Sequence, residues 1–144
     1  MLSISHAVTG AFIATKVANP YLAIPLILTA HYLEDAVPHW DVGTGLTKGT
    51  KSSALVFRHE LLDLTLAGLL VILMFRSSGL TPYWGAFLGL LPDFLESPRN
   101  FLHSEPRWLT PINRFHQLFH HSIPKVWAGL APQILLLTLL WFLR

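Results

Sequence analysis

Apolar stretches of helical length alternate with short polar breaks along the chain, and this pattern predicts an all-α protein. Capping residues and prolines mark helix starts, as at Asn19 with Pro20. A short amphipathic helix beginning at Thr110 is expected in the polar stretch before the last helix. The five main helices are expected at about residues 5–18, 19–37, 54–75, 81–91 or slightly beyond, and 122–144.

The composition makes a membrane protein the first expectation. Of the 144 residues, 52% are hydrophobic and only 12% are charged, which is far more apolar than a typical soluble domain. Residues 126–143 carry no charge, and at about 1.5 Å per residue such a helix crosses most of a hydrocarbon core about 30 Å thick. We therefore expect one domain, residues 1–144, folded as a polytopic membrane bundle of about five helices.

If the helices alternate in direction across the membrane, the histidines and acidic residues collect on one side. All eight histidines and all eight acidic residues fall there, whereas the opposite helix ends carry only Lys16, Arg76 and Arg144 as charged residues. The other seven of the ten cations lie with the histidines, so the positive-inside rule predicts that this side faces the cytoplasm across the inner membrane. The cations form no run or stripe, so nucleic acid is not an expected partner.

Histidines and carboxylates spaced four residues apart make this side a candidate metal centre. Residues with that spacing project from one face of a helix and can share an ion. Three pairs have it: His31 and Asp35, His59 and Asp63, and His116 and His120. Pro38 ends the second helix, so that His39 and Asp41 fold back over the same place. With His6 and Asp93 the chain offers ten nitrogen or oxygen ligands, and one zinc ion needs three or four, so we expect two or three ions, zinc or another divalent metal.

Clustered ions at headgroup level indicate a hydrolase. Such ions clamp a phosphate group and lower the pKa of a water towards 7, so the expected substrate is a phosphoester of a lipid or lipid-linked molecule, with membrane lipid as partner. Glu34 and Asp35 are the candidate catalytic carboxylates, Asp35 as a ligand and Glu34 as either the general base or a group that orients a ligand.

Two other functions stay open. One is a metal-ion transporter or sensor that uses the same ligands, and the other is a structural membrane protein whose His/Asp network only joins helices. Transport has less support, because a path across the membrane needs polar positions and the remote halves of the helices offer few: Thr15, Thr29, Gln133 and Thr138.

Four short motifs resemble those of the membrane-bound, metal-dependent hydrolases related to zinc-dependent phospholipase C. They are the segment around His6, the acidic helix end at residues 31–41, the Arg58-His59 helix start and the Leu-Pro-Asp sequence that ends at Asp93. The resemblance implies an all-helical fold and a multinuclear zinc site in which His-x-x-x-Asp pairs supply ligands. Transferred residue by residue, it implies these ligands above the others: His6, His31, Asp35, His59, Asp63 and Asp93.

Overall fold

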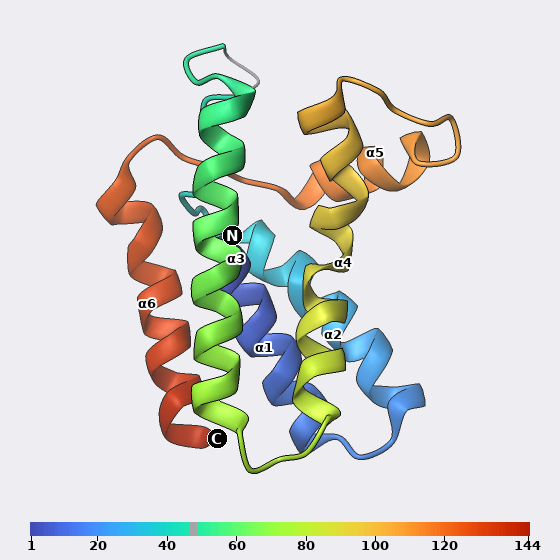
Figure 1. Ribbon diagram of the computed structural model, residues 1–144, viewed down its shortest axis with the longest axis vertical. Helices are drawn as coiled ribbons and strands as arrows, with labels where there is room; N and C mark the ends of the chain where they lie inside the picture. Colours follow the sequence, from blue (N-terminus) through green and yellow to red (C-terminus); the bar gives the residue numbers. More distant parts are fainter. Residues whose placement is uncertain (47–48) are drawn as a thin grey trace.

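The computed structural model describes residues 1–46 and 49–144, and within that part of the chain it contains helices and no strand (Figure 1). The helices are α1 (Ser3–Lys16), α2 (Pro20–Ala36), α3 (Ser53–Phe75), α4 (Thr81–Leu102), α5 (Thr110–Phe119) and α6 (Val126–Leu143). Five of them correspond to the helices expected from the apolar pattern, and α5 is the expected short amphipathic helix. The prediction of an all-α protein is confirmed.

Helix α1 lies at the centre of the bundle, where it contacts α2, α3, α4 and α6. Burial of small and aliphatic side chains from these helices supplies the main driving force for their packing. The core cluster around α1 consists of Ala7, Val8, Ala11, Ala67, Val71, Met74, Phe75, Leu90 and Leu140. Because α1 is surrounded in this way, its polar residues, His6 among them, are held inside the protein.

Helices α1 and α4 cross with their backbones in contact, and glycines make this possible. A Cβ atom on Gly10 would lie 2.2 Å from the carbonyl oxygen of Gly85, and one on Gly89 would lie 2.3 Å from the carbonyl oxygen of His6. Small residues at such crossings allow close helix packing. The contact brings the His6 side chain to Asp93, one turn beyond Gly89, with 4.0 Å between His6 Nε2 and Asp93 Oδ2.

We expect Gly85→Ala to destabilise the protein strongly. The added Cβ would lie 2.4 Å from both the Gly10 carbonyl oxygen and the Ala14 Cβ, so the helices must separate. Overpacking of this kind costs about 1–3 kcal/mol, or more where backbone has to move. Thermal unfolding in detergent measures the loss. Gly68→Ala is the matched control, because a Cβ there meets nothing within 4 Å. Equal unfolding temperatures for the two variants would contradict the crossing.

Helix α4 continues well past its expected end near residue 91. Proline is unfavourable inside a helix, since it lacks the N–H that the helix uses and clashes with the preceding turn. The helix nevertheless contains both Pro92 and Pro98 and ends at Leu102, followed by His103 with a left-handed φ of 50°. Pro92 is buried, so tertiary packing outweighs the local preference of proline for a helix end. The extension keeps Asp93 and Glu96 on a helix.

Only one helix in the described residues is long and apolar enough to cross a membrane: α6, with a mean hydropathy of 1.9 over 18 residues. Just 17% of this segment is buried, so neighbouring helices do not enclose it. Helices α1 and α2, with 14 and 17 residues, are too short to meet this requirement. Helices α3 and α4 are long enough, but the charged side chains along one half make them too polar. The expected polytopic arrangement is therefore not supported.

Candidate metal centre

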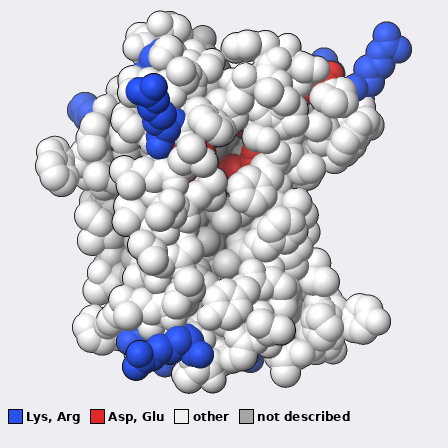
Figure 2. Space-filling view, in the orientation of Figure 1, with Lys and Arg blue, Asp and Glu red and all other residues white. Residues whose placement is uncertain are grey.

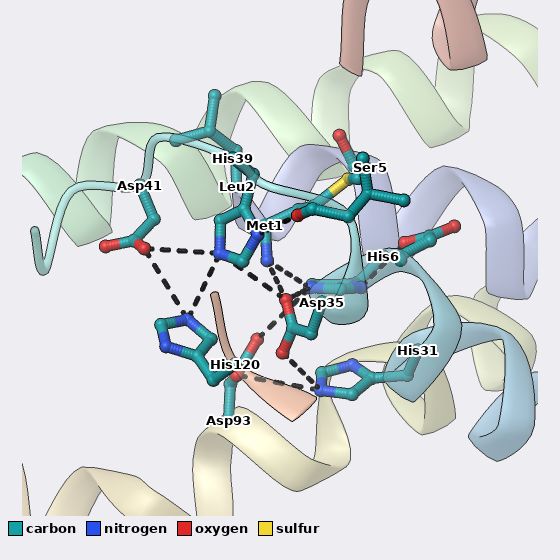
Figure 3. Close-up of polar contacts among 12 residues, drawn as sticks. Met1, Leu2, Ser5, His6, His31, Asp35, His39, Asp41, Asp93 and His120 are labelled. Atoms are coloured by element: carbon teal, nitrogen blue, oxygen red, sulfur yellow. Dashed lines mark hydrogen bonds and ion pairs between the residues drawn. The ribbon is translucent and has the colours of Figure 1, made fainter. Parts of the chain in front are cut away.

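Predicted ligands from three stretches of the chain, residues 31–41, Asp93 and residues 116–120, converge at one place in the bundle (Figure 3). His6, the ligand predicted on α1, lies beside them, with its Nε2 atom 3.2 Å from Asp35 Oδ1. Helix α2 supplies His31 and Asp35 from one face, as their spacing predicts. Helix α4 supplies Asp93, and α5 supplies His116 from its last turn. The remaining ligands follow helix ends and are His39 and Asp41 after α2 and His120 after α5.

Backbone pairing between two loops places His39 against His120. The His39 N–H donates to the carbonyl oxygen of His121 at 3.1 Å, and the Ile123 N–H donates to the carbonyl oxygen of His39 at 2.7 Å. The His121 N–H donates to the Asp35 carbonyl at the end of α2, at 3.0 Å. The two imidazoles consequently face each other, with 3.3 Å between their Nε2 atoms.

Asp35 lies between two groups of histidines, and its side chain is fully buried. Its Oδ2 atom is 2.8 Å from His116 Nε2 and 3.5 Å from His31 Nε2. Its Oδ1 atom is 3.2 Å from His6 Nε2 and 3.7 Å from His39 Nε2. Each carboxylate oxygen therefore faces a different part of the cluster.

The first ligand group, which we call the inner set, is His31, Asp35, Asp93 and His116, and its donor atoms lie within 4.8 Å of one another. The two imidazoles point their Nε2 atoms at each other across 3.2 Å. Asp93 Oδ1 lies 3.8 Å from His31 Nε2 and 3.7 Å from His116 Nε2. Four nitrogen and oxygen donors are the number that a tetrahedral zinc ion takes.

The second group, the outer set, shares Asp35 with the first and adds His39 and His120. Asp41 lies beside this set, with its Oδ2 atom 3.4 Å from His39 Nε2 and 3.5 Å from His120 Nε2. This oxygen has no hydrogen-bond partner although it is buried. A buried carboxylate oxygen without a partner is costly, and a bound cation would satisfy it.

Neighbouring acceptors orient the imidazoles so that their Nε2 atoms face the cluster. Nδ1 of His31 is 2.7 Å from the Gly89 carbonyl oxygen, and Nδ1 of His39 is 2.8 Å from that of Val37. A backbone acceptor holds the proton on Nδ1 and leaves the lone pair on Nε2, as in metal-bound histidines. Lone pairs that face each other at these distances repel unless a cation or proton lies between them, so the arrangement fits a metal ion.

A positively charged group already lies at this place. The Met1 amino group pairs with Asp35, and its nitrogen is 2.9 Å from His6 Nε2 (Figure 3). Met1 is buried, so this charge is held by the protein groups around it. Asp35 Oδ1 thus pairs with an ammonium group on the side that also faces His6 and His39.

The pKa values of one group from each set show that the site favours charged side chains. Burial lowers the pKa of His116, but the hydrogen bond with Asp35 and the nearby carboxylates of Glu96 and Asp93 together outweigh burial and raise that pKa to about 10. Burial raises the pKa of Asp41, but the nearby His39 and His120 imidazoles and the amino terminus together outweigh burial and hold the pKa below its usual value. Both groups are therefore biased to their charged forms, with positive charge held among carboxylates.

Two of the sequence-predicted ligands, His59 and Asp63, are not brought into the cluster. His59 is exposed near the start of α3. Asp63 is buried, but its Oδ2 accepts the Ser3 N–H at 2.6 Å and its Oδ1 accepts the Ile4 N–H at 3.4 Å. It caps the start of α1, where the first N–H groups of a helix lack partners. Helical spacing alone cannot tell such a cap from a ligand.

Glu34 and Glu96 act on ligands from outside the cluster. Glu34 Oε2 is 2.7 Å from His6 Nδ1, and of the two roles left open for Glu34 this contact fits orienting a ring. Glu96 Oε1 is 3.5 Å from His116 Nδ1. Glu96 was not among the predicted site residues, although its position three residues after Asp93 on one helix was the available signal.

A cavity of about 480 Å³ opens onto the cluster. Figure 2 shows acidic atoms at the bottom of a hollow on this face of the molecule. Three ligands line the cavity, Asp41, Asp93 and His120, and its other walls come from α3, α4 and the loop after α2. The other ligands of the two sets do not line it.

Comparison with known protein families, with curated proteins and with solved structures found no match for this chain. The resemblance to membrane-bound metal-dependent hydrolases therefore stays a prediction. What the described residues define is a class, an all-helical protein with His/Asp clusters that could bind a metal ion.

Proposed function

We propose that this protein is a metal-dependent hydrolase that cleaves a phosphoester of a membrane lipid or lipid-linked molecule. The observation that carries the proposal is Asp35, whose two oxygens face different histidines. Two ions held by a shared ligand act together on the entering and leaving oxygens of one phosphate. The cavity above the cluster has the size of a small-molecule site, for which about 300–1,000 Å³ is typical.

The inner and outer sets would hold two zinc ions. When bound, such ions polarise a phosphoryl oxygen and lower the pKa of a water. Hydrolysis adds one water to the ester: the water oxygen bonds to phosphorus, the P–O ester bond breaks, and a water proton ends on the leaving oxygen. His120 and Asp93 have side chains that are 33% and 29% exposed, whereas that of Asp35 is fully buried, so the substrate approaches from the side of His120 and Asp93.

We further propose that the apolar half of the bundle lies in the inner membrane, with the metal centre at headgroup level on the cytoplasmic side. Large apolar side chains are exposed on α3 and α6, such as Leu69 at 59% and Leu135 at 71%. Figure 2 shows a band without Lys, Arg, Asp or Glu between the two ends of the visible face. Such a surface favours lipid over water.

Metal analysis of the purified protein tests the site. We expect two equivalents of zinc per chain, and we expect the double variant His31→Ala with His116→Ala to lose the inner ion, because both imidazoles belong to the inner set. His59→Ala is the matched control, since it removes an exposed imidazole outside the cluster. Elemental analysis after dialysis gives the stoichiometry. Equal zinc content in all three proteins would contradict the site.

Turnover separates the hydrolase from the alternatives. With bis(p-nitrophenyl) phosphate as probe, the wild type is expected to release p-nitrophenol, to stop after chelation and to recover on addition of zinc. Bound zinc without turnover would overturn the hydrolase and favour a transporter or sensor. Absence of zinc together with unchanged stability under chelation would favour a structural network.

A further inference from the structure

The cavity above the metal ligands has an apolar wall that the hydrolase proposal does not use. Its polar end carries Asp41, Asp93 and His120. The rest of the lining is mixed: it includes polar residues such as Glu60, Arg99 and Gln117. It also has a hydrocarbon wall from two helices, formed by Phe57, Leu61 and Leu64 on α3 and Phe94, Phe101 and Leu102 on α4. A site for a small polar ester would not need such a wall, whereas a site for an amphiphile would.

Residues of the wall are also exposed on the outside of α3 and α4. Leu61 is 49% exposed and Phe94 is 37% exposed, although both line the cavity. Leu61 continues into the exposed apolar face of α3, where Leu62 and Leu69 are 58% and 59% exposed. An apolar chain could move from this face into the cavity without crossing water.

An aromatic pair connects the two helices at this wall. The rings of Phe57 on α3 and Phe101 on α4 meet edge to face, with 5.4 Å between their centroids. Phe57 is itself 47% exposed, so the pair lies at the boundary between cavity and exterior. The paired rings therefore offer an apolar surface where the wall meets the exterior.

We propose that the cavity binds one hydrocarbon chain of a membrane lipid, with the lipid phosphate at the proposed metal ions beside Asp41, Asp93 and His120 and the chain packed against the paired rings of Phe57 and Phe101. This inference rests on the proposed function and names how its substrate is bound. Three observations select a lipid: the metal ligands at one end of the cavity, the hydrocarbon at the other, and the continuity of that wall with the exposed face of α3. The volume of about 480 Å³ suits a phosphate group with part of one chain.

A chain-length series tests the wall by kinetics. The probes are ethyl, hexyl and decyl p-nitrophenyl phosphate, measured with zinc-loaded wild type and with the double variant Phe57→Ala, Phe101→Ala in one detergent. We expect the two proteins to hydrolyse the ethyl ester within about twofold of each other, and the double variant to lose about tenfold or more in kcat/KM on the decyl ester, since each buried methylene contributes up to about fourfold. Phe142→Ala, which removes an exposed ring on α6, should behave as wild type.

Cross-linking tests the same wall without turnover. In phosphatidylglycerol nanodiscs that contain a phosphatidylglycerol with a mid-chain diazirine, we expect labels on α3 and α4 at the cavity wall, and at least about fivefold less label there in the double variant. Labels confined to the outer faces of the helices, or equal chain-length dependence in both proteins, would overturn the lipid chain site. Cavity labelling without hydrolysis of any ester would overturn the proposed function and retain the lipid site.

Discussion

Asp35→Asn is expected to remove both metal ions and to lower phosphodiester hydrolysis by more than about 100-fold. Changes to residues that only orient a metal ligand cost about 10–100-fold, and Asp35 belongs to both ligand sets. An amide keeps the shape of the side chain but has no charge and only one acceptor oxygen. The readouts are zinc content by elemental analysis and release of p-nitrophenol from bis(p-nitrophenyl) phosphate.

Asp63→Asn is the control for this prediction. Asp63 is also a buried aspartate near the cluster, but it accepts the N–H groups of Ser3 and Ile4 at the start of α1. The variant should keep both zinc ions and lose only some stability, because one cap is weakened. If Asp63→Asn lost as much zinc as Asp35→Asn, Asp63 would be a metal ligand, as the sequence predicted. Its capping of α1 would then be secondary.

Gly129→Ala is expected to remove the outer ion and leave the inner one. Gly129 lies on α6 against the loop that carries His39 and Asp41, and an added Cβ would be 2.2 Å from the Trp40 nitrogen and 2.7 Å from the His39 carbonyl carbon. Packed backbone cannot accommodate that contact, so the loop must move. The inner set has no ligand in this loop, and one zinc equivalent should remain.

Zinc stoichiometry and turnover of Gly129→Ala are to be compared with those of Gly68→Ala. A Cβ on Gly68 meets nothing within 4 Å, and alanine is the better helix former, so the control should keep two ions and normal activity. Two ions in Gly129→Ala, with wild-type turnover, would show that α6 does not hold the outer ligands in place. A drop to zero ions would show that the two sets are not independent.

Helix α6 connects the apolar half of the bundle to the metal ligands through one further residue. Gln133 is buried, and its Nε2 donates to the carbonyl oxygens of Trp40 and Gly129, each at 2.8 Å. Its Oε1 accepts the Leu2 N–H at 2.8 Å. The sequence showed Gln133 only as an isolated polar residue in an apolar segment. Two of these partners, Trp40 and Leu2, lie more than ninety positions away in the chain, so no local pattern could have indicated the contacts with them.

The helices and much of the ligand chemistry could be predicted because both follow from local rules. Caps, prolines and the apolar period place the helix boundaries, and the spacing of His31 and Asp35 puts both side chains on one face of α2 in any fold that keeps the helix. The same local rules were misleading at Pro92, where burial keeps α4 continuous, and at His59, which shares a helix with Asp63 but is exposed.

The amino-acid sequence by itself determined that the chain is helical, that it is rich in apolar surface and that His31 and Asp35 lie one turn apart. Only the tertiary structure decided which ligands meet. His39 faces His120 because two loops pair through their backbones, and Asp35 joins two ligand sets because α1, α2, α4 and α5 meet around it. The physical reason is that spacing specifies directions within one helix, whereas distances between helices depend on side-chain packing and on close contacts such as that of Gly10 with Gly85.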